Sequence, residues 1–540
     1  MMKNVLRFCA DTAMILAALI TFTAFTVARA QTCTVDWNNV HQQIDGFGAS
    51  SAWNGTWTTN QADVLFSTNL NVVYSDNLGN AYTNNGIGLS LLRNRIIYAS
   101  STSSNVAVTA DAIVDMEMAQ ARGARVWSTP WTPAAGFKSG NDIYDSGTAT
   151  DGGIDGGSYL GSGNNATNQA YAWQLANYVA NLKKPLIHVN LYAISIQNEP
   201  DADVTTYEAC QWSGAQIHDF VTNLYNALVA DGVGSTRIML PESESWSDPH
   251  NLAGPAMADT NVAADVGIIA DHDYDGSNGP KNSYGKALWE TEVSKLSGET
   301  SDITNGVYYA QRIFLFMTVA QANAWNYWWI VPSGSQTGLM TEQAGPTKRM
   351  FTVGNYSRFV RPGYYRIGVT NNTSLTLISA YKDTNSGNFA IVAVNPNSSV
   401  VTQMFNLTNF PAVSSVTPWI TSAGFSLANQ SAVSVANGSF TYPLPALSVV
   451  TFAGQSLAVP SSVTISNVSY NPTTPAFVLT WNSTAGATYS VFKTNVLGGS
   501  ATGWPAIVTG YPDGGAPGGP LSYTDTTATL SPAFYEVSSP

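Results

Sequence analysis

Charged side chains are scarce in this chain, and basic ones are the scarcest. Asp, Glu, Lys and Arg make up 11% of the 540 residues, and 35 acidic against 22 basic residues leave a net charge of −13. Such a chain repels nucleic acid and anionic membrane surfaces, so we expect neither as a partner. A neutral polymer would meet no such repulsion.

Cysteine and histidine are also rare, with three and five copies. Neither a CxxC nor an HExxH spacing occurs, so the sequence indicates no catalytic metal. After the export step described next, Cys33 and Cys210 are the cysteines that remain. In an oxidising compartment they could pair or stay free, and their spacing does not decide between these outcomes.

Long apolar runs are missing as well. The stretch Met14–Phe25 is shorter than the roughly 20 residues of a membrane helix, and no later run approaches that length. Two basic residues precede this stretch, and the small-residue sequence Ala28-Arg29-Ala30 follows it. This pattern predicts an export signal over residues 1–30 and a mature chain that begins at Gln31 and is secreted, to the periplasm or beyond the cell.

Hydrophobic residues make up 44% of the chain, and between residues 43 and 330 they fall into short apolar runs that alternate with amphipathic stretches. The runs predict eight strands, at Ile44–Gly48, Gly88–Leu92, Ala124–Trp127, Ala193–Ile196, Ile238–Leu240, Val266–Ile269, Ala287–Trp289 and Ala324–Tyr327. Helices are predicted between them, for example at Ala112–Ala121, Gln169–Leu182 and Gln216–Ala230. Eight strands alternating with helices predict an α/β fold, a (β/α)8 TIM barrel over residues 43–360.

A different pattern follows residue 360. Alternating strands such as Ser374–Ala380, Phe389–Val394 and Leu447–Phe452 predict a side β domain over residues 361–454. Residues 455–462 are predicted to be a linker. Residues 463–540 alternate again, at Phe477–Trp481 and Thr488–Phe492, and predict a small C-terminal β-sandwich.

Unusual residues stand where the predicted barrel strands end, and barrel active sites lie at these carboxyl ends. They are Trp131, Asn198-Glu199-Pro200, Glu242, His272 with Tyr274, Glu292, and Trp328-Trp329. The aperiodic segment Ser139–Asn168, rich in Gly, Asn and Asp, predicts a long loop on the same face.

Glu199 and Glu292 are separated by 292 − 199 = 93 residues, which is three barrel units of about 31 residues. That spacing puts them on strands 4 and 7, where two carboxyl groups could flank a bound sugar, as glycoside hydrolysis requires. The chain also has 15 Trp and 25 Tyr, whose rings can stack on sugars. The alternative is that both are ordinary exposed or ion-paired glutamates.

Four segments resemble glycoside hydrolase family 30, and the last points to its subfamily 8 xylanases. They are Gln43–Gly48, Ser195–Pro200, Leu288–Glu292 and Arg358–Ile367, and the resemblance extends over about residues 34–454. It implies a retaining mechanism and no cofactor. It also implies a side β domain that is built from both chain ends, with residues 31–42 as its first strand.

The resemblance assigns roles residue by residue. Glu199 is expected to be the acid/base and Glu292 the nucleophile, whose charge raises the pKa of Glu199. The expected substrate-binding residues are Asn198 at a sugar 2-hydroxyl, Arg93 on strand 2 beside the nucleophile, Tyr274 next to Glu292, and Trp131, Trp329 and Trp53 along the cleft.

The sequence departs from glucuronate-dependent members of the family after Trp329. Ser333 and Ser335 stand where those enzymes have an Arg and a Tyr that hold the glucuronate side group. The expected protein is therefore a secreted, monomeric retaining endo-β-1,4-xylanase that acts on xylan without requiring glucuronate. Alternatives are a strict glucuronoxylanase, a β-1,6-glucanase or glucosylceramidase-like member, and a non-catalytic carbohydrate-binding protein. The two intact glutamates argue against the last.

Overall fold

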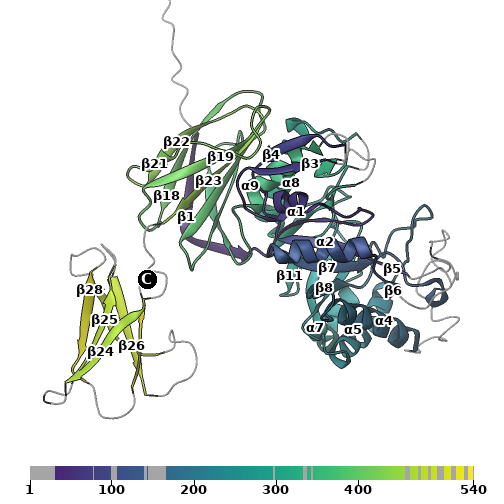
Figure 1. The fold of residues 1–540 in the computed structure, drawn as a ribbon, viewed down its shortest axis with the longest axis horizontal. Coiled ribbons are helices and arrows are strands. Elements are labelled where there is room, and N and C mark those ends of the chain that lie inside the picture. The colour runs from purple at the N-terminus through teal and green to yellow at the C-terminus, as the bar shows by residue number, and fades with distance from the viewer. Residues whose placement is uncertain are drawn as a thin grey trace, which may run out of the picture.

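The structure is a computed structural model, and it describes most of the chain after residue 30 (Figure 1). The described residues are 31–76, 78–98, 106–138, 143, 166–295, 298–332, 337–341, 345–456, 463–471, 473, 476–483, 488–495, 504–512, 519–527 and 533–538. The predicted export signal, most of the predicted loop Ser139–Asn168, and Ser333 and Ser335 lie outside this set.

The predicted barrel is confirmed. Eight parallel strands pair in the order β2, β12, β11, β10, β9, β8, β7 and β5, and a further pairing of β2 with β5 closes the ring. Their bounds are β2 Gly46–Ser50, β5 Leu91–Tyr98, β7 Arg125–Pro130, β8 Leu191–Ser195, β9 Arg237–Ser243, β10 Val266–Asp271, β11 Ala287–Glu290 and β12 Ala324–Trp329. Each predicted strand run overlaps one of these strands.

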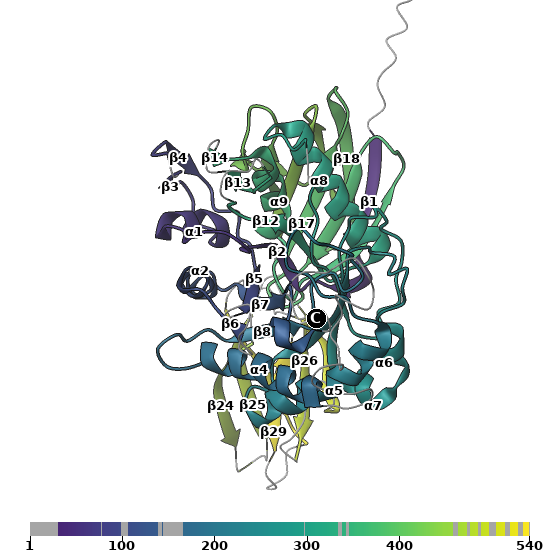
Figure 2. The same ribbon diagram turned by 90° about the vertical axis from the view of Figure 1, so that its right-hand side faces the viewer.

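Helices surround the barrel, and Figure 2 shows α1, α2, α4 and α5 beside strands β5, β7 and β8. The helices are α1 Thr59–Phe66, α2 Ala110–Ala121, α4 Ala166–Leu182, α5 Gly214–Ala230, α6 Gly254–Ala258, α7 Thr260–Asp265, α8 Ile303–Leu315 and α9 Lys348–Ser357. Short helical turns occur at η1 Ala135–Phe137 and η2 Phe316–Ala320, and short strands at β3 Val72–Ser75, β4 Ala81–Asn84, β6 Val106–Ala107, β13 Met340–Thr341 and β14 Gly345–Pro346.

Local sequence explains where α5 begins and which face it buries. Ser213 and Gln216 form a reciprocal capping box, which satisfies backbone N–H groups in the first turn. The buried apolar residues recur with helical spacing, so they form one stripe that faces the barrel. They are Ile217, Phe220, Val221, Leu224 and Leu228.

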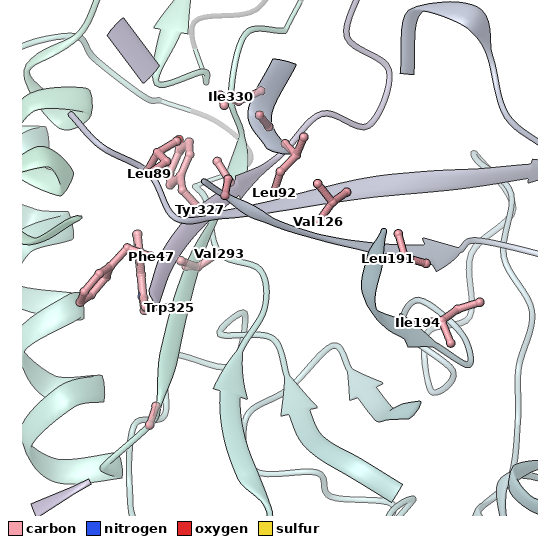
Figure 3. Packing of buried hydrophobic residues seen from close by; sticks show 14 of the residues in the cluster. Phe47, Leu89, Leu92, Val126, Leu191, Ile194, Val293, Trp325, Tyr327 and Ile330 are labelled. Atoms are coloured by element: carbon pink, nitrogen blue, oxygen red, sulfur yellow. The ribbon is translucent and has the colours of Figure 1, made fainter. Parts of the chain in front are cut away.

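Strand side chains alternate between the barrel interior and the helical layer. Leu91, Trp127 and Ala193 belong to a buried cluster drawn from seven barrel strands, which fills the interior. Their neighbours, such as Leu92, Val126 and Ile194, belong to the larger cluster that the helices cover (Figure 3). The interior is tightly packed at Gly48, where a Cβ atom would lie 2.4 Å from Asn326 Oδ1.

A ten-stranded sheet packs beside the barrel. Its strands are β1 Gln31–Gln43, β15 Tyr365–Asn371, β16 Leu377–Lys382, β17 Asn388–Asn395, β18 Val401–Thr408, β19 Ser415–Thr421, β20 Ala428–Asn429, β21 Val433–Ser434, β22 Ser439–Leu444 and β23 Ser448–Gln455. Strand β1 pairs with both β15 and β18, so the start of the described chain joins segments that follow the barrel. Asn355 of α9 ties the sheet to the barrel, because its amide donates to Trp419 O over 2.9 Å.

The two cysteines of the described chain are both buried. Cys33 lies in the core of the ten-stranded sheet, whereas Cys210 lies in the core between barrel and helices. They are therefore in separate clusters and form no disulfide.

The last segment contains two three-stranded sheets, β24-β25-β28 and β27-β26-β29. The strands are β24 Ile465–Asn471, β25 Ala476–Asn482, β26 Thr488–Thr494, β27 Ala506–Pro512, β28 Pro520–Asp525 and β29 Phe534–Ser538. Leu479, Trp481, Tyr489, Val491 and Val537 form a core of their own. Across all the described residues, no helix combines the length and apolarity needed to cross a membrane.

Candidate active site

Two carboxyl groups meet at the carboxyl ends of the barrel strands. Glu199 follows β8, the fourth barrel strand, and Glu292 follows β11, the seventh. One carboxylate oxygen of each lies within 4.8 Å of the other. The residues are 6% and 4% exposed, so both carboxyl groups are held out of bulk water.

The backbone is unusual at Glu199. Its φ is +46°, in the left-handed region that residues with a Cβ seldom adopt, although Pro200 follows it and favours extended backbone at this position. The Glu199 N–H donates to Glu242 O over 2.9 Å, and Glu242 itself has φ +58°. Such conformations cost free energy and are concentrated at sites where a side chain must be aimed.

Arg93 on β5 lies beneath the two carboxyl groups and is fully buried. Its guanidinium donates to Glu292, and over 2.7 Å to Asn198 Oδ1. It also forms an ion pair of 3.1 Å with Glu242, which is fully buried too. The ring of Trp131 lies 4.6 Å from the guanidinium carbon. One arginine therefore joins the ends of three barrel strands, β8, β9 and β11.

Three further groups reach the carboxyl pair. Tyr207 donates to Glu199 Oε2 over 2.9 Å, and Tyr274 donates to Glu292 Oε1 over 2.8 Å. His272, fully buried after β10, lies with Nδ1 3.1 Å from Glu199 Oε1. Each carboxyl group is thus fixed by at least two hydrogen-bond partners.

His272 carries a positive charge in this surrounding. Burial lowers its pKa, but the charge of Glu292 and the contacts with Glu199 and Glu242 outweigh burial and raise the pKa well above the ordinary value. Two cations, Arg93 and His272, therefore face three buried glutamates. The cluster becomes neutral when the glutamates together keep one proton.

The two carboxyl groups differ in how the pocket treats them. Burial raises the pKa of Glu199, but His272, the Tyr207 hydrogen bond and the charge of Arg93 outweigh it and lower the pKa. At Glu292 burial prevails, and the charge of Glu199 adds to it, so the pKa is raised. This order reverses the one expected from the sequence, because the donors that converge on Glu199 come from distant segments. The two carboxyl groups titrate as a unit, so their pKa values belong to the pair.

An open pocket of about 460 Å³ lies over the pair. It is lined by Trp53, Trp131, Glu199, Tyr207, Glu244, Tyr274, Glu292, Trp328 and Trp329. Trp53 is 40% exposed, whereas Trp131 is 2% exposed. Trp328 and Trp329 stack with ring centroids 5.3 Å apart. Aromatic faces beside two carboxyl groups suit a sugar ring held at its anomeric carbon.

The structure brings all eight residues singled out from the sequence to this one region. Six of them line the pocket, but Arg93 and Asn198 lie below it, with the Asn198 amide engaged by Arg93 and Glu199. Sequence reasoning missed Tyr207 and Glu244 as pocket residues. Tyr207 lies in an irregular segment without a motif, so no sequence signal marked it.

Glu199, His272 and Glu292 form a group that could hold a metal ion by distance alone. Their chemistry does not fit one. A protonated imidazole offers no lone pair, and Arg93 and His272 already neutralise the carboxylates. The arrangement instead suits proton transfer and nucleophilic attack by two carboxyl groups in one pocket.

Curated glucuronoxylanases are similar to this chain over nearly their whole length. Glucuronoxylanase XynC of Bacillus subtilis strain 168 is 31% identical over 442 residues, which cover 79% of this chain and 93% of that protein. A second Bacillus subtilis protein of that name is 30% identical over 439 residues, covering 79% and 92%. No protein-family model matches the chain.

Several solved structures are also similar to this chain. Xyn30A of Clostridium acetobutylicum, a glycoside hydrolase family 30 subfamily 8 xylanase, is 33% identical with a TM-score of 0.66, covering 79% of this chain and all of that one. A family 30 endoxylanase of Clostridium papyrosolvens C71 is 28% identical with a TM-score of 0.64 and the same coverage. The endo-β1,6-glucanase BT3312, 18% identical with a TM-score of 0.58, shares the fold.

Proposed function

This chain belongs to glycoside hydrolase family 30, and on that premise we propose that it is a secreted retaining endo-β-1,4-xylanase that does not require glucuronate side groups. Glu199 is the acid/base and Glu292 is the nucleophile. The xylanases and glucuronoxylanases among its relatives support xylan as the substrate.

The observation that carries this proposal is the closeness of the two carboxyl groups. Retaining enzymes hold their carboxyl groups about 5–5.5 Å apart, whereas inverting enzymes separate them by about 6.5–9.5 Å to admit a water molecule. Oxygen atoms of Glu199 and Glu292 lie within 4.8 Å of each other, which supports direct attack by one carboxylate. Arg93 and Tyr274 hold Glu292 toward the pocket for that attack.

The first half of the reaction forms a covalent intermediate. Glu292 attacks the anomeric carbon, the bond to the glycosidic oxygen breaks, and that oxygen takes the shared proton from Glu199. A bound glycosidic oxygen favours the proton on Glu199, where it is donated, and the positive character of the anomeric carbon favours ionised Glu292. Bound substrate therefore favours the proton on Glu199, although in the empty pocket the proton is favoured on Glu292.

The second half releases the sugar. Glu199, now a carboxylate, takes a proton from a water molecule, whose oxygen attacks the anomeric carbon and displaces Glu292. The configuration at that carbon is inverted twice and so is retained. The hydrogen bond from Tyr207 stabilises the Glu199 carboxylate in this step.

The pocket lining supports relaxed specificity. Among the described residues that line it are three glutamates and neither Lys nor Arg. A hydrogen bond to a charged group contributes about 1.5–3 kcal/mol, so lack of a guanidinium partner removes on the order of ten- to a hundredfold of preference for glucuronate. Ser333 and Ser335, which replace the expected Arg and Tyr, extend the same argument from the sequence.

Product analysis tests this function. Unsubstituted xylan and glucuronoxylan should be cut at comparable rates, and product lengths should not follow the glucuronate spacing. Glu199→Gln and Glu292→Gln should each lower kcat on xylan by about 10²–10⁴-fold or more while the protein stays folded. Products that each carry one glucuronate at a fixed position, with linear xylan uncut, would instead identify a strict glucuronoxylanase. Cleavage of β-1,6-glucan in place of xylan would identify the glucanase alternative.

Export and domain division are parts of the same proposal. Residues 1–30 direct export, so the secreted protein should begin at Gln31 by mass spectrometry. Residues 463–540, which have a core of their own, should be dispensable for cleavage of soluble xylooligosaccharides, since every residue that lines the pocket precedes them. A folded truncation that loses this activity would contradict the division.

A further inference from the structure

Arg95 is a second, partly buried arginine on the strand that carries Arg93. Side chains two residues apart on a strand point to the same side, so Arg95 lies one layer nearer the pocket opening than Arg93. Its guanidinium forms an ion pair with Glu208, and the two side chains are 16% and 10% exposed. The Trp53 ring lies 4.3 Å from the Arg95 guanidinium carbon.

The two partners of Arg95 both belong to the pocket wall or adjoin it. Trp53 lines the pocket and is held at φ +53°, a strained conformation for a bulky residue. Glu208 directly follows Tyr207, in the segment 200–213 that has neither helix nor strand. Tyr207 lines the pocket and donates to Glu199. Arg95 thereby connects a pocket-lining ring to Glu208, the neighbour in sequence of the tyrosine that hydrogen-bonds Glu199.

We propose that the Arg95–Glu208 ion pair is a positioning device that fixes the Tyr207 segment and so holds the Tyr207 hydroxyl on Glu199. The proposal rests on the proposed function, because it assigns Glu199 a proton to transfer. One strand then positions both carboxyl groups: Arg93 holds Glu292 directly, and Arg95 acts on Glu199 through Glu208 and Tyr207.

A purely structural role for the pair is the competing explanation. The same segment is already anchored at Ala209, whose carbonyl accepts from Lys138 Nζ over 2.5 Å and whose N–H donates to Ile143 O over 3.2 Å. Those contacts hold the backbone beyond Glu208, whereas Arg95 acts next to Tyr207. Loss of a merely structural pair would lower stability without moving the pH profile.

The pH profile is therefore the deciding measurement. Apart from Tyr207, the ionisable groups that face Glu199 are Arg93, Glu244, His272, Tyr274 and Glu292. None of them is paired with Arg95 or Glu208 in the described structure. Loss of the Tyr207 hydrogen bond raises the pKa of Glu199, because that bond stabilises the carboxylate. The basic limb of kcat, which reports the substrate complex in which Glu199 holds the proton, then moves to higher pH.

The experiment compares Glu208→Gln, Tyr207→Phe and the double variant on an unsubstituted xylooligosaccharide. Glu208→Gln should lower kcat about tenfold with KM changed less, and should move the basic limb in the same direction as Tyr207→Phe. In the Tyr207→Phe background it should add almost no further shift. Arg95→Lys, which keeps the charge but loses the planar fork, should act in the same way and serves if Glu208→Gln does not fold.

A matched control is Asp63→Asn, which breaks the 2.7 Å ion pair with Arg122 away from the pocket and should leave the profile unchanged. An unmoved basic limb in both Glu208→Gln and Arg95→Lys, or shifts that add fully to that of Tyr207→Phe, would overturn the proposal. Failure of the proposed function would look different, because the wild-type protein would then leave xylooligosaccharides uncut.

Discussion

Two fully buried arginines, Arg93 and Arg349, hold different parts of this barrel together. Arg93 contacts Glu292 and Glu242 beneath an open pocket. Arg349 at the start of α9 forms a 3.1 Å ion pair with Glu299 and donates to Gly338 O over 2.6 Å. Burial and ion pairing alone therefore do not distinguish them.

Charge balance and access do distinguish them. Around Arg93 and His272 three glutamates converge, which leaves one proton to be shared and moved. Around Arg349 the ion pair with Glu299 is balanced one to one, and the rings of Tyr309 and Tyr327 pack on the guanidinium at 5.7 and 5.1 Å. A buried ion pair indicates chemistry when it carries an exchangeable proton and faces a space that a substrate can fill.

The largest effect is expected on activity when the Arg93 charge is removed. Arg93→Met should lower kcat/KM on xylan by about a hundred- to a thousandfold, since breaking a buried ion pair costs about 3–5 kcal/mol, part of which the pocket regains by taking up protons. Arg93 lowers the pKa of Glu292, so its loss raises that pKa and moves the acidic limb of kcat, which reports the substrate complex in which Glu292 is ionised, to higher pH. Steady-state kinetics against pH measures both. An unchanged acidic limb would contradict the role of Arg93 in setting the pKa of Glu292.

Arg349→Met is the matched substitution at the other arginine. It should lower the free energy of unfolding by about 3–5 kcal/mol, because Glu299 is left buried without its cation. Denaturant unfolding measures this loss, and active-site titration separates it from any change in kcat. The folded fraction should keep the wild-type kcat. A drop in kcat as large as that of Arg93→Met would show that the two arginines are not different in kind.

A smaller effect is expected at Asp115, a buried carboxyl group that, unlike the glutamates beside Arg93 and Arg349, has no ion pair among the described residues. Asp115 of α2 accepts the Trp57 N–H over 3.1 Å, and burial raises its pKa to about 8. The folded protein therefore holds a proton that the unfolded chain has lost, and stability falls as the pH rises from about 4 to about 8. Asp115→Asn keeps the acceptor and removes this slope.

Thermal unfolding of the wild type and Asp115→Asn at several pH values tests this sign. The two Tm curves should diverge with rising pH, with the variant higher at pH 8. Parallel curves would mean that Asp115 is ionised in the folded protein. Activity should be unaffected, because Asp115 lies on an outer helix away from the pocket.

Periodicity was sufficient to predict the barrel. Runs such as Ala193–Ile196 and Val266–Ile269 are apolar on both faces because parallel barrel strands are covered inside and outside, and the structure confirms them as β8 and β10. The positions of Glu199 and Glu292 followed from counting barrel units. The short hairpin β3–β4 was not predicted, since its burial alternates over only four residues per strand.

The contacts within the site that were not predicted join distant segments of the chain. Tyr207 reaches Glu199 from an irregular segment, and Glu242 joins Arg93 across 149 positions of sequence (242 − 93). No local pattern encodes such meetings, and the pKa order of the carboxyl pair depends on them. Local sequence predicts elements and strand ends, whereas the electrostatics of the site follow from tertiary packing.

The central claim is that Glu292 forms a covalent bond to the sugar, and mass spectrometry tests it most directly. A 2-deoxy-2-fluoro-xylobiosyl fluoride has a leaving group that departs readily, while its 2-fluorine destabilises the positive character of both transition states and slows release of the sugar. The account predicts that the peptide containing Glu292 gains the mass of one 2-deoxy-2-fluoro-xylobiosyl group, because the anomeric fluoride leaves. It predicts no such gain in Glu292→Gln. A label on Glu199 or Glu242, or turnover with inverted configuration and no adduct, would contradict it.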